Sequence, residues 1–272
     1  MFTPEEEIWL QFLGFMTAQS PQQVSLNCVE NFAIEPNAIP SHYDASISNS
    51  LMLGKRAERF LSFHIQQHPN YEILAENVQI VHEKETIGEL DFLLKHSEIG
   101  LIHLEMACKF YLYNPEATTI HKIWCGPNNR DFLSHKKQKL MEHQFPLLQD
   151  VRTQQVLHDL NISSDAYTQM LLFQNFCFLP AQYEGTQDGV DNTNNAGTWM
   201  NQDTFESLSF DRELFFFPKK TNWLVDPMYN REWHLLDAIK PKVQAELKNR
   251  NSPMLWVLHP DGRTERWFVV WW

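Results

Sequence analysis

The chain has 272 residues, of which 43% are hydrophobic and 13% aromatic, and this composition indicates a globular protein with a full core. The net charge of −12 argues against tight non-specific binding of duplex nucleic acid, since such binding comes from lysines and arginines that neutralise phosphates. No apolar run is long enough to span a bilayer and the first residues lack the basic region of a signal peptide, so we expect a cytoplasmic protein without membrane association.

The cysteines give no sign of a zinc site or a disulfide framework. Cys28, Cys108, Cys125 and Cys177 are scattered along the chain without CxxC spacing. Cys108 and Cys177 fall in apolar segments, so we expect buried free thiols in a reducing compartment.

The N-terminal segment predicts one helix and then irregular chain. Thr3, Pro4 and Glu6 form a helix start in which threonine caps, proline takes the first turn and glutamate completes a capping box. The apolar stripe that follows favours packing on the core over binding of a partner. Residues 20–50, which contain several prolines, predict irregular structure.

A helix and a strand come next. Residues 51–67 carry apolar side chains at helical spacing and end before Pro69. Residues 71–82 are rich in strand formers and lead into the central hairpin.

Residues 87–113 predict a β-hairpin that carries acids where a sheet is normally apolar. Its arms are 89–94 and 101–112, joined by a short polar turn that includes Gly100. Side chains alternate between the two faces of a strand. The face that bears charge therefore comprises Glu89, Asp91 and Leu93 on the first arm and His103, Glu105, Ala107 and Lys109 on the second.

Asp91 and Glu105 are the residues from which we predict chemistry. A carboxylate among leucines and isoleucines is costly to bury alone and needs a cation. Two carboxylates on adjacent strands offer the hard oxygen ligands that Mg²⁺ prefers. A metal held there activates water as a nucleophile, and a lysine on the same face stabilises charge on a phosphate.

The hairpin resembles the signature of the PD-(D/E)XK nuclease superfamily, through GELDFL at 88–93, Leu104-Glu105 and the nearby Lys109. The order GKRAER, GELDFLL, HLEMACKFYL, WCGP is similar to that of a bacterial domain family of unknown function within this superfamily. The resemblance implies that Asp91 and Glu105 bind one or two Mg²⁺ or Mn²⁺ ions and that a lysine assists the attacking water. It covers roughly residues 51–179 for the superfamily and most of the chain for the narrower family.

The lysine departs from the superfamily pattern, because Ala107 occupies the usual position and Lys109 lies two residues further on. At about 3.3 Å per residue, Lys109 is roughly 13 Å from Glu105 along the strand, where the usual spacing gives about 7 Å. If Lys109 is too distant, Lys136 is the first other candidate for the catalytic lysine. It shares the side of Phe132 and Leu140 on a helix predicted over 131–149, where it either snorkels to water or reaches an acid.

Three other residues have both a functional and a packing interpretation. Glu58 is a third metal-binding acid by the resemblance, or an exposed partner of Arg56 or Arg59. Trp124 and Arg130, in the loop region 114–130, could contact a base and a phosphate, but a buried tryptophan and a helix-start arginine are favoured on general grounds.

The predicted fold class is α/β, with a restriction-endonuclease-like core of helix, three-stranded meander, helix and strand, followed by a C-terminal α+β extension. The last core strand is 167–179. The extension contains a flexible surface loop near 182–202, a helix around 231–249 and a hairpin of 254–258 with 265–271. The division predicted is 1–50 packed on the core, 51–180 as the core and 181–272 as the extension.

Three functions remain open. The first is a metal-dependent phosphodiesterase acting on DNA or RNA, with Asp91, Glu105 and Glu58 as metal ligands and Lys109 or Lys136 as the catalytic lysine. The second is a catalytically inactive nuclease-like fold that serves as a binding or assembly module. The third is purely structural, a salt-bridged face of Asp91, Glu105 and Lys109 that points to water.

Overall fold

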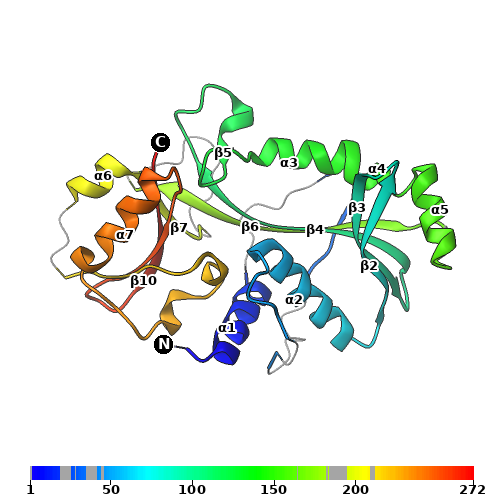
Figure 1. The fold of residues 1–272 in the computed structure, drawn as a ribbon, viewed down its shortest axis with the longest axis horizontal. Coiled ribbons are helices and arrows are strands. Elements are labelled where there is room, and N and C mark those ends of the chain that lie inside the picture. Colours follow the sequence, from blue (N-terminus) through cyan, green and yellow to red (C-terminus); the bar gives the residue numbers. More distant parts are fainter. Residues whose placement is uncertain are drawn as a thin grey trace. The chain divides into compact units, whose positions relative to one another are not determined.

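The computed structural model of the chain describes residues 2–18, 26–27, 29–34, 42–43, 46–163, 165–181, 183, 195–208 and 212–272. The chain forms two compact units (Figure 1). The first comprises Met1–Gln22, Lys109–Ser134 and Asn175–Trp272, and the second comprises Gln23–Cys108 and His135–Gln174.

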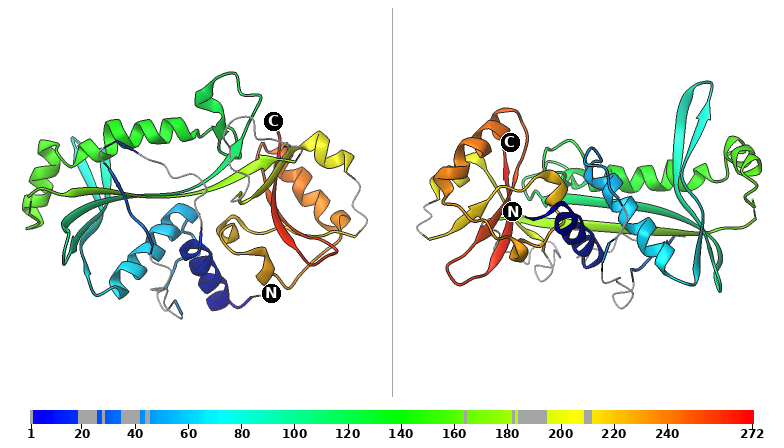
Figure 2. Two further views of the ribbon diagram at one scale, coloured as in Figure 1. Left: turned by 180° about the vertical axis from the view of Figure 1, so that it is seen from behind. Right: turned by 60° about the horizontal axis from the view of Figure 1, so that its bottom comes forward.

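The second unit contains the predicted order of helix, three-stranded meander, helix and strand. Its elements are β1 (Glu30–Asn31), α2 (Leu53–Gln67), β2 (Tyr71–His82), β3 (Glu85–His96), β4 (Gly100–Tyr113), α3 (Leu133–Lys139), the π-helical segment η3 (Leu140–Gln144), α4 (Phe145–Leu147), α5 (Val151–Asp159) and β6 (Thr168–Pro180). The ends of α3, β4 and β6 extend into the first unit. The α/β class and the meander are confirmed. In Figures 1 and 2, α2 and α3 lie on different sides of β4 and β6.

The first unit holds the remaining elements. These are α1 (Pro4–Met16), η2 (Ile120–Lys122), β5 (Trp124–Cys125), β7 (Gly197–Asn201), α6 (Gln202–Ser207), β8 (Leu214–Phe216), η4 (Lys220–Asn222), η5 (Pro227–Tyr229), α7 (Leu236–Lys248), β9 (Met254–Leu258) and β10 (Thr264–Val270). Among the described residues the strands join in the order β2-β3-β4-β6-β7-β10-β9-β8, with β1 on β6 and β5 on β4.

The expected capping box begins α1. Oγ1 of Thr3 accepts a hydrogen bond from the backbone N–H of Glu6 at 3.2 Å, and the backbone N–H of Thr3 donates to Oε2 of Glu6 at 2.9 Å. These two bonds satisfy donors that the first helical turn leaves without partners.

The helix predicted over 131–149 is divided into α3, η3 and α4. Pro146 lies two residues after the π-helical segment and has no backbone N–H to continue the α-helical ladder. A separate helix, α5, comes after it, begins at Asp150 as N-cap and was not predicted.

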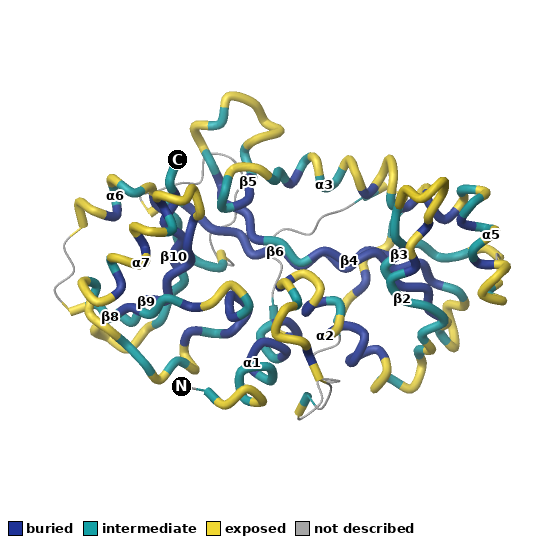
Figure 3. Tube along the Cα trace, in the orientation of Figure 1, coloured by how far each residue is buried: buried dark blue, intermediate teal, exposed yellow. Residues whose placement is uncertain are grey.

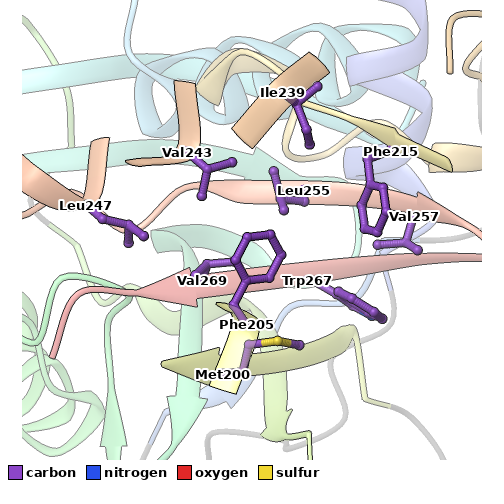
Figure 4. Close-up of a cluster of buried hydrophobic side chains, with 10 residues drawn as sticks. All are labelled: Met200, Phe205, Phe215, Ile239, Val243, Leu247, Leu255, Val257, Trp267 and Val269. Atoms are coloured by element: carbon purple, nitrogen blue, oxygen red, sulfur yellow. The ribbon is translucent and has the colours of Figure 1, made fainter. Parts of the chain in front are cut away.

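Strands β4 and β6 are buried along most of their length (Figure 3). In the first unit, α7 and α6 pack on the strands through the cluster shown in Figure 4. Its buried members are Met200, Phe205, Phe215, Ile239, Val243, Leu247, Leu255, Val257, Trp267 and Val269. The predicted last hairpin is confirmed as the antiparallel pair of β9 and β10.

The stretch predicted as a loop, 182–202, lies mostly outside the described residues, which omit 182 and 184–194. Its end forms β7, which pairs in parallel with both β6 and β10. A Cβ on Gly197 would lie 2.0 Å from the backbone oxygen of Arg266, so the close approach of β7 to β10 requires glycine here.

The cysteines form no disulfide among the described residues. Cys125 and Cys177 are buried thiols and Cys108 is half-buried, whereas Cys28 lies outside the described residues. No described helix has the length and apolar content needed to cross a membrane.

Candidate functional site

Asp91 and Glu105 face each other where the β3–β4 ladder ends. Phe92 and Leu104 are the last paired residues in the register, which makes Asp91 and Glu105 the next opposing positions. Beyond this point side chains replace the backbone carbonyls as acceptors. Oδ2 of Asp91 accepts from the backbone N–H of Met106 at 2.9 Å, and Oε1 of Glu105 accepts a longer bond from the backbone N–H of Asp91 at 3.5 Å.

The two carboxylates share a site largely shielded from water. The Glu105 side chain is 1% exposed. Burial, and secondly the negative charge of Glu105, raise the pKa of Asp91 to about 8, although the hydrogen bond from Met106 opposes the shift. The structural hypothesis of a solvated ion-paired face therefore does not describe this pair.

His103 and Gln144 hold the Glu105 carboxylate from two directions. Nε2 of His103, which is fully buried, lies 2.9 Å from Oε1 of Glu105. Nε2 of Gln144 donates to Oε2 of Glu105 at 2.9 Å and to the backbone oxygen of Glu89 at 3.2 Å. Each carboxylate oxygen has two lone pairs, so these bonds orient Glu105 and leave it acceptor capacity.

Neither His103 nor Gln144 was predicted from the sequence as a site residue. The sequence pattern could have indicated His103, because it lies two residues from Glu105 on the same face of the strand. Gln144 is the last residue of η3, and its position depends on a helical register that the sequence pattern did not predict.

Glu58 is held by Lys55, which was not among the site residues predicted from the sequence. Nζ of Lys55 lies 2.7 Å from Oε2 of Glu58, 2.6 Å from Oε1 of Glu89 and 2.8 Å from Oδ1 of Asn77. Burial raises the pKa of Glu58 against the opposing effect of Lys55. The charge of Glu58 also contributes to the raised pKa of Asp91, so helix α2 brings this acid into the same electrostatic environment.

The arginines suggested as partners of Glu58 make other interactions. Arg56 is buried and donates to the backbone oxygens of Leu51 and Ser48. Arg59 pairs with Glu76 at 2.7 Å, and its positive charge also acts to lower the pKa of Glu58.

The two candidate lysines lie in different environments. The positive charge of Lys136 acts to lower the pKa of Asp91, which places this lysine near the acid pair. Nζ of Lys109 instead donates to Oδ2 of Asp131 at 2.6 Å, and both residues belong to the first compact unit. The interactions therefore associate Lys136, and not Lys109, with Asp91.

A divalent cation at the acid pair would take two protein ligands. Among the described residues no group of three or more histidine, cysteine, aspartate or glutamate side chains is arranged to hold a metal. Mg²⁺ is commonly bound by one or two carboxylates, with water or substrate phosphate completing its octahedron. Asp91 and Glu105 supply such a pair of hard oxygen ligands.

Trp124 lies on strand β5, and Arg130 lies between β5 and α3. Trp124 is half-buried and packs against Tyr113 with ring centroids 5.2 Å apart, in agreement with the packing interpretation. Arg130 is exposed.

Comparison with curated proteins gave no match, and comparison with solved structures gave none either. A family model described as a domain of unknown function, DUF1853, matches residues 8–270. Because this match covers nearly the whole chain, the chain belongs to the DUF1853 family.

Proposed function

We propose that this protein is a metal-dependent phosphodiesterase that hydrolyses nucleic acid. The observation that carries the proposal is the pair of Asp91 and Glu105, brought together in a shielded site where β3 and β4 separate. The resemblance of residues 88–109 to the PD-(D/E)XK nuclease signature supports the same reaction class.

Asp91 and Glu105 are the proposed ligands of Mg²⁺ or Mn²⁺, and Glu58 adds negative charge beside them. The bound cation would supply a water of lowered pKa. His103 and Gln144 keep the Glu105 oxygens in a fixed orientation, so that little reorganisation is needed when substrate arrives.

Lys136 is the proposed catalytic lysine. Its ammonium lies in the electrostatic neighbourhood of Asp91, where it can stabilise negative charge on a phosphate. Lys137 and Lys139 are on the same helix, so α3 presents three lysines within a protein whose net charge is −12. A local group of cations is what a phosphate backbone requires.

The alternative function is a nuclease-like fold without catalytic activity that serves as a binding or assembly module. Two observations favour it: Lys109 is engaged by Asp131, and the described residues contain no three-member ligand group. In this case the acid pair is a structural feature at the end of the β3–β4 ladder.

Incubation of the purified chain with labelled single-stranded and double-stranded DNA and RNA, with Mg²⁺ or Mn²⁺, tests the proposal. We expect cleavage that falls at least about 100-fold in Asp91→Asn and Glu105→Gln, because each change removes a negatively charged ligand. Glu98→Gln, in the exposed turn of the same hairpin, is the control and should retain activity. Cleavage that persists in both site variants would rule out the assignment.

A thermal-shift titration separates the two functions. A metal that binds only the folded chain stabilises it by about 2.7 kcal/mol at a hundredfold excess over its dissociation constant. Stabilisation by Mn²⁺ that disappears in Glu105→Gln supports the metal site. No stabilisation at millimolar Mg²⁺ or Mn²⁺, together with no cleavage, favours the binding module.

A further inference from the structure

The first compact unit contains a pocket of about 500 Å³ that is separate from the acid pair. The lining residues come from the start of the chain, the end of β8 and the segment after it, and helix α7. This volume is within the range of small-molecule binding sites.

One wall of the pocket is aromatic and rigidly supported. The ring of Phe216 stacks on Trp256, with centroids 5.3 Å apart and planes inclined at 28°. Phe217 packs against the buried cluster of Figure 4. Rings fixed in this way offer a flat surface on which a planar ligand can stack at little cost in side-chain entropy.

The rest of the lining brings three cations together. These are Lys219, Arg231 and Lys242, beside the acids Glu7 and Glu232. Arg231 lies over the ring of Phe2, at 5.9 Å from its centroid, and pairs with Glu6 at 3.9 Å, whereas no ion pair of Lys219 or Lys242 is found among the described residues. In a chain of net charge −12, such a group of cations favours an anionic ligand.

Two asparagines add directional polar groups. The buried Asn222 accepts a 2.6 Å hydrogen bond from Gln11 through Oδ1, so its amide hydrogens remain as donors. Asn230 donates through Nδ2 to the backbone oxygen of Glu232 at 2.6 Å, which leaves its Oδ1 as an acceptor. A donor and an acceptor fixed next to an aromatic wall suit the edge of a heteroaromatic ring.

We infer that this pocket binds a nucleotide, with the base against Phe216 and Phe217 and the phosphate near Lys219 and Lys242. Stacking together with cationic groups is the combination by which proteins hold single nucleotide units. The nucleotide is either a free mononucleotide or one unit of a nucleic-acid strand. The inference goes beyond the proposed hydrolysis, because every lining residue belongs to the unit that lacks Asp91 and Glu105.

Calorimetric titration of the full chain with AMP, adenosine and inorganic phosphate, in EDTA, tests the inference without any need for catalysis. We expect saturable binding of AMP that is at least tenfold tighter than that of adenosine or phosphate. Absence of AMP binding at millimolar concentration overturns the inference.

Variants assign the binding to the pocket. We expect the double variant Lys219→Ala, Lys242→Ala to bind AMP at least tenfold more weakly and to bind adenosine with unchanged affinity. Phe217→Leu, which keeps an apolar side chain, should weaken the binding of both AMP and adenosine about fivefold or more. Lys248→Ala, on the same helix α7 but outside the lining, is the matched control. An equal loss of AMP affinity in this control, or no loss of affinity in the pocket variants, contradicts the assignment.

Competition identifies the source of the nucleotide. A short single-stranded oligonucleotide that binds more tightly than AMP and displaces it indicates a strand as the ligand. An oligonucleotide that does not displace AMP indicates a free mononucleotide.

Discussion

The backbone N–H of Met106 donates a 2.9 Å hydrogen bond to Oδ2 of Asp91, across the point where β3 and β4 stop pairing through their backbones. This bond stabilises the charged form of an acid whose burial and neighbouring carboxylate favour the neutral form. The aspartate is thus fixed in position and is electrostatically strained without a cation, which has measurable consequences.

The first consequence is a pH-dependent stability in the absence of metal. The unfolded pKa of an aspartate is about 3.9 and the folded pKa of Asp91 is raised to about 8, so between these values only the folded state holds the proton. The contribution of Asp91 to the free energy of unfolding should therefore fall as pH rises from about 4 to about 8 and then level off.

Asp91→Asn should remove this contribution, since asparagine does not ionise and its Oδ1 can still accept from Met106. The stability of Asp91→Asn relative to the parent chain should increase across the same pH range. Urea unfolding in EDTA at pH 5, 6, 7 and 8 measures the difference in the free energy of unfolding between the two chains. A difference that stays constant with pH would show that Asp91 is ionised in the folded state throughout.

The second prediction concerns the orientation of Glu105 by Gln144. Gln144→Ala removes a hydrogen bond to Oε2 of Glu105 and should weaken Mn²⁺ binding about tenfold, the lower end of what loss of a ligand-orienting partner typically costs. Electron paramagnetic resonance titration of Mn²⁺ measures the affinity. Gln138→Ala, whose side chain contacts the exposed Glu142 on the same helical stretch, should bind Mn²⁺ as the parent does. Equal affinities in both variants would exclude a role for Gln144.

The third prediction separates the two candidate lysines. Lys136→Met should lower kcat about 100-fold or more and leave Mn²⁺ affinity nearly unchanged, because the lysine is proposed to act on substrate charge. Lys109→Met should retain most of the activity, since Nζ of Lys109 is engaged by Asp131. Steady-state kinetics with a labelled oligonucleotide distinguish them, and the opposite ranking would return the role to Lys109.

The fourth prediction tests the close contact of β7 with β10. Gly197→Ala should lower the free energy of unfolding by about 3 kcal/mol or more, because the new Cβ meets a backbone oxygen that cannot move independently and φ is +153°. Gly54→Ala is the control. Its Cβ meets nothing within 4 Å on helix α2, so the helix should gain about 0.5–1 kcal/mol. Denaturant unfolding measures the free energy of unfolding of both variants. An unchanged value in Gly197→Ala would contradict the close packing of β7 on β10.

The sequence by itself determined the local features of this protein. Side-chain alternation along β3 and β4 gave Asp91 and Glu105 a common face, because the two-residue period of a strand does not depend on its neighbours. Likewise the capping box at Thr3 and Glu6 formed as expected, since its hydrogen bonds join residues only three positions apart.

Only the tertiary structure decided which groups surround the acids. Gln144 reaches Glu105 across 39 positions and Lys55 reaches Glu89 across 34, and no local pattern encodes such distances. The engagement of Lys109 by Asp131, 22 positions away, is likewise a contact between separate segments of the chain. Periodicity fixes the direction of a side chain relative to its own backbone, whereas its partners depend on how the elements pack together.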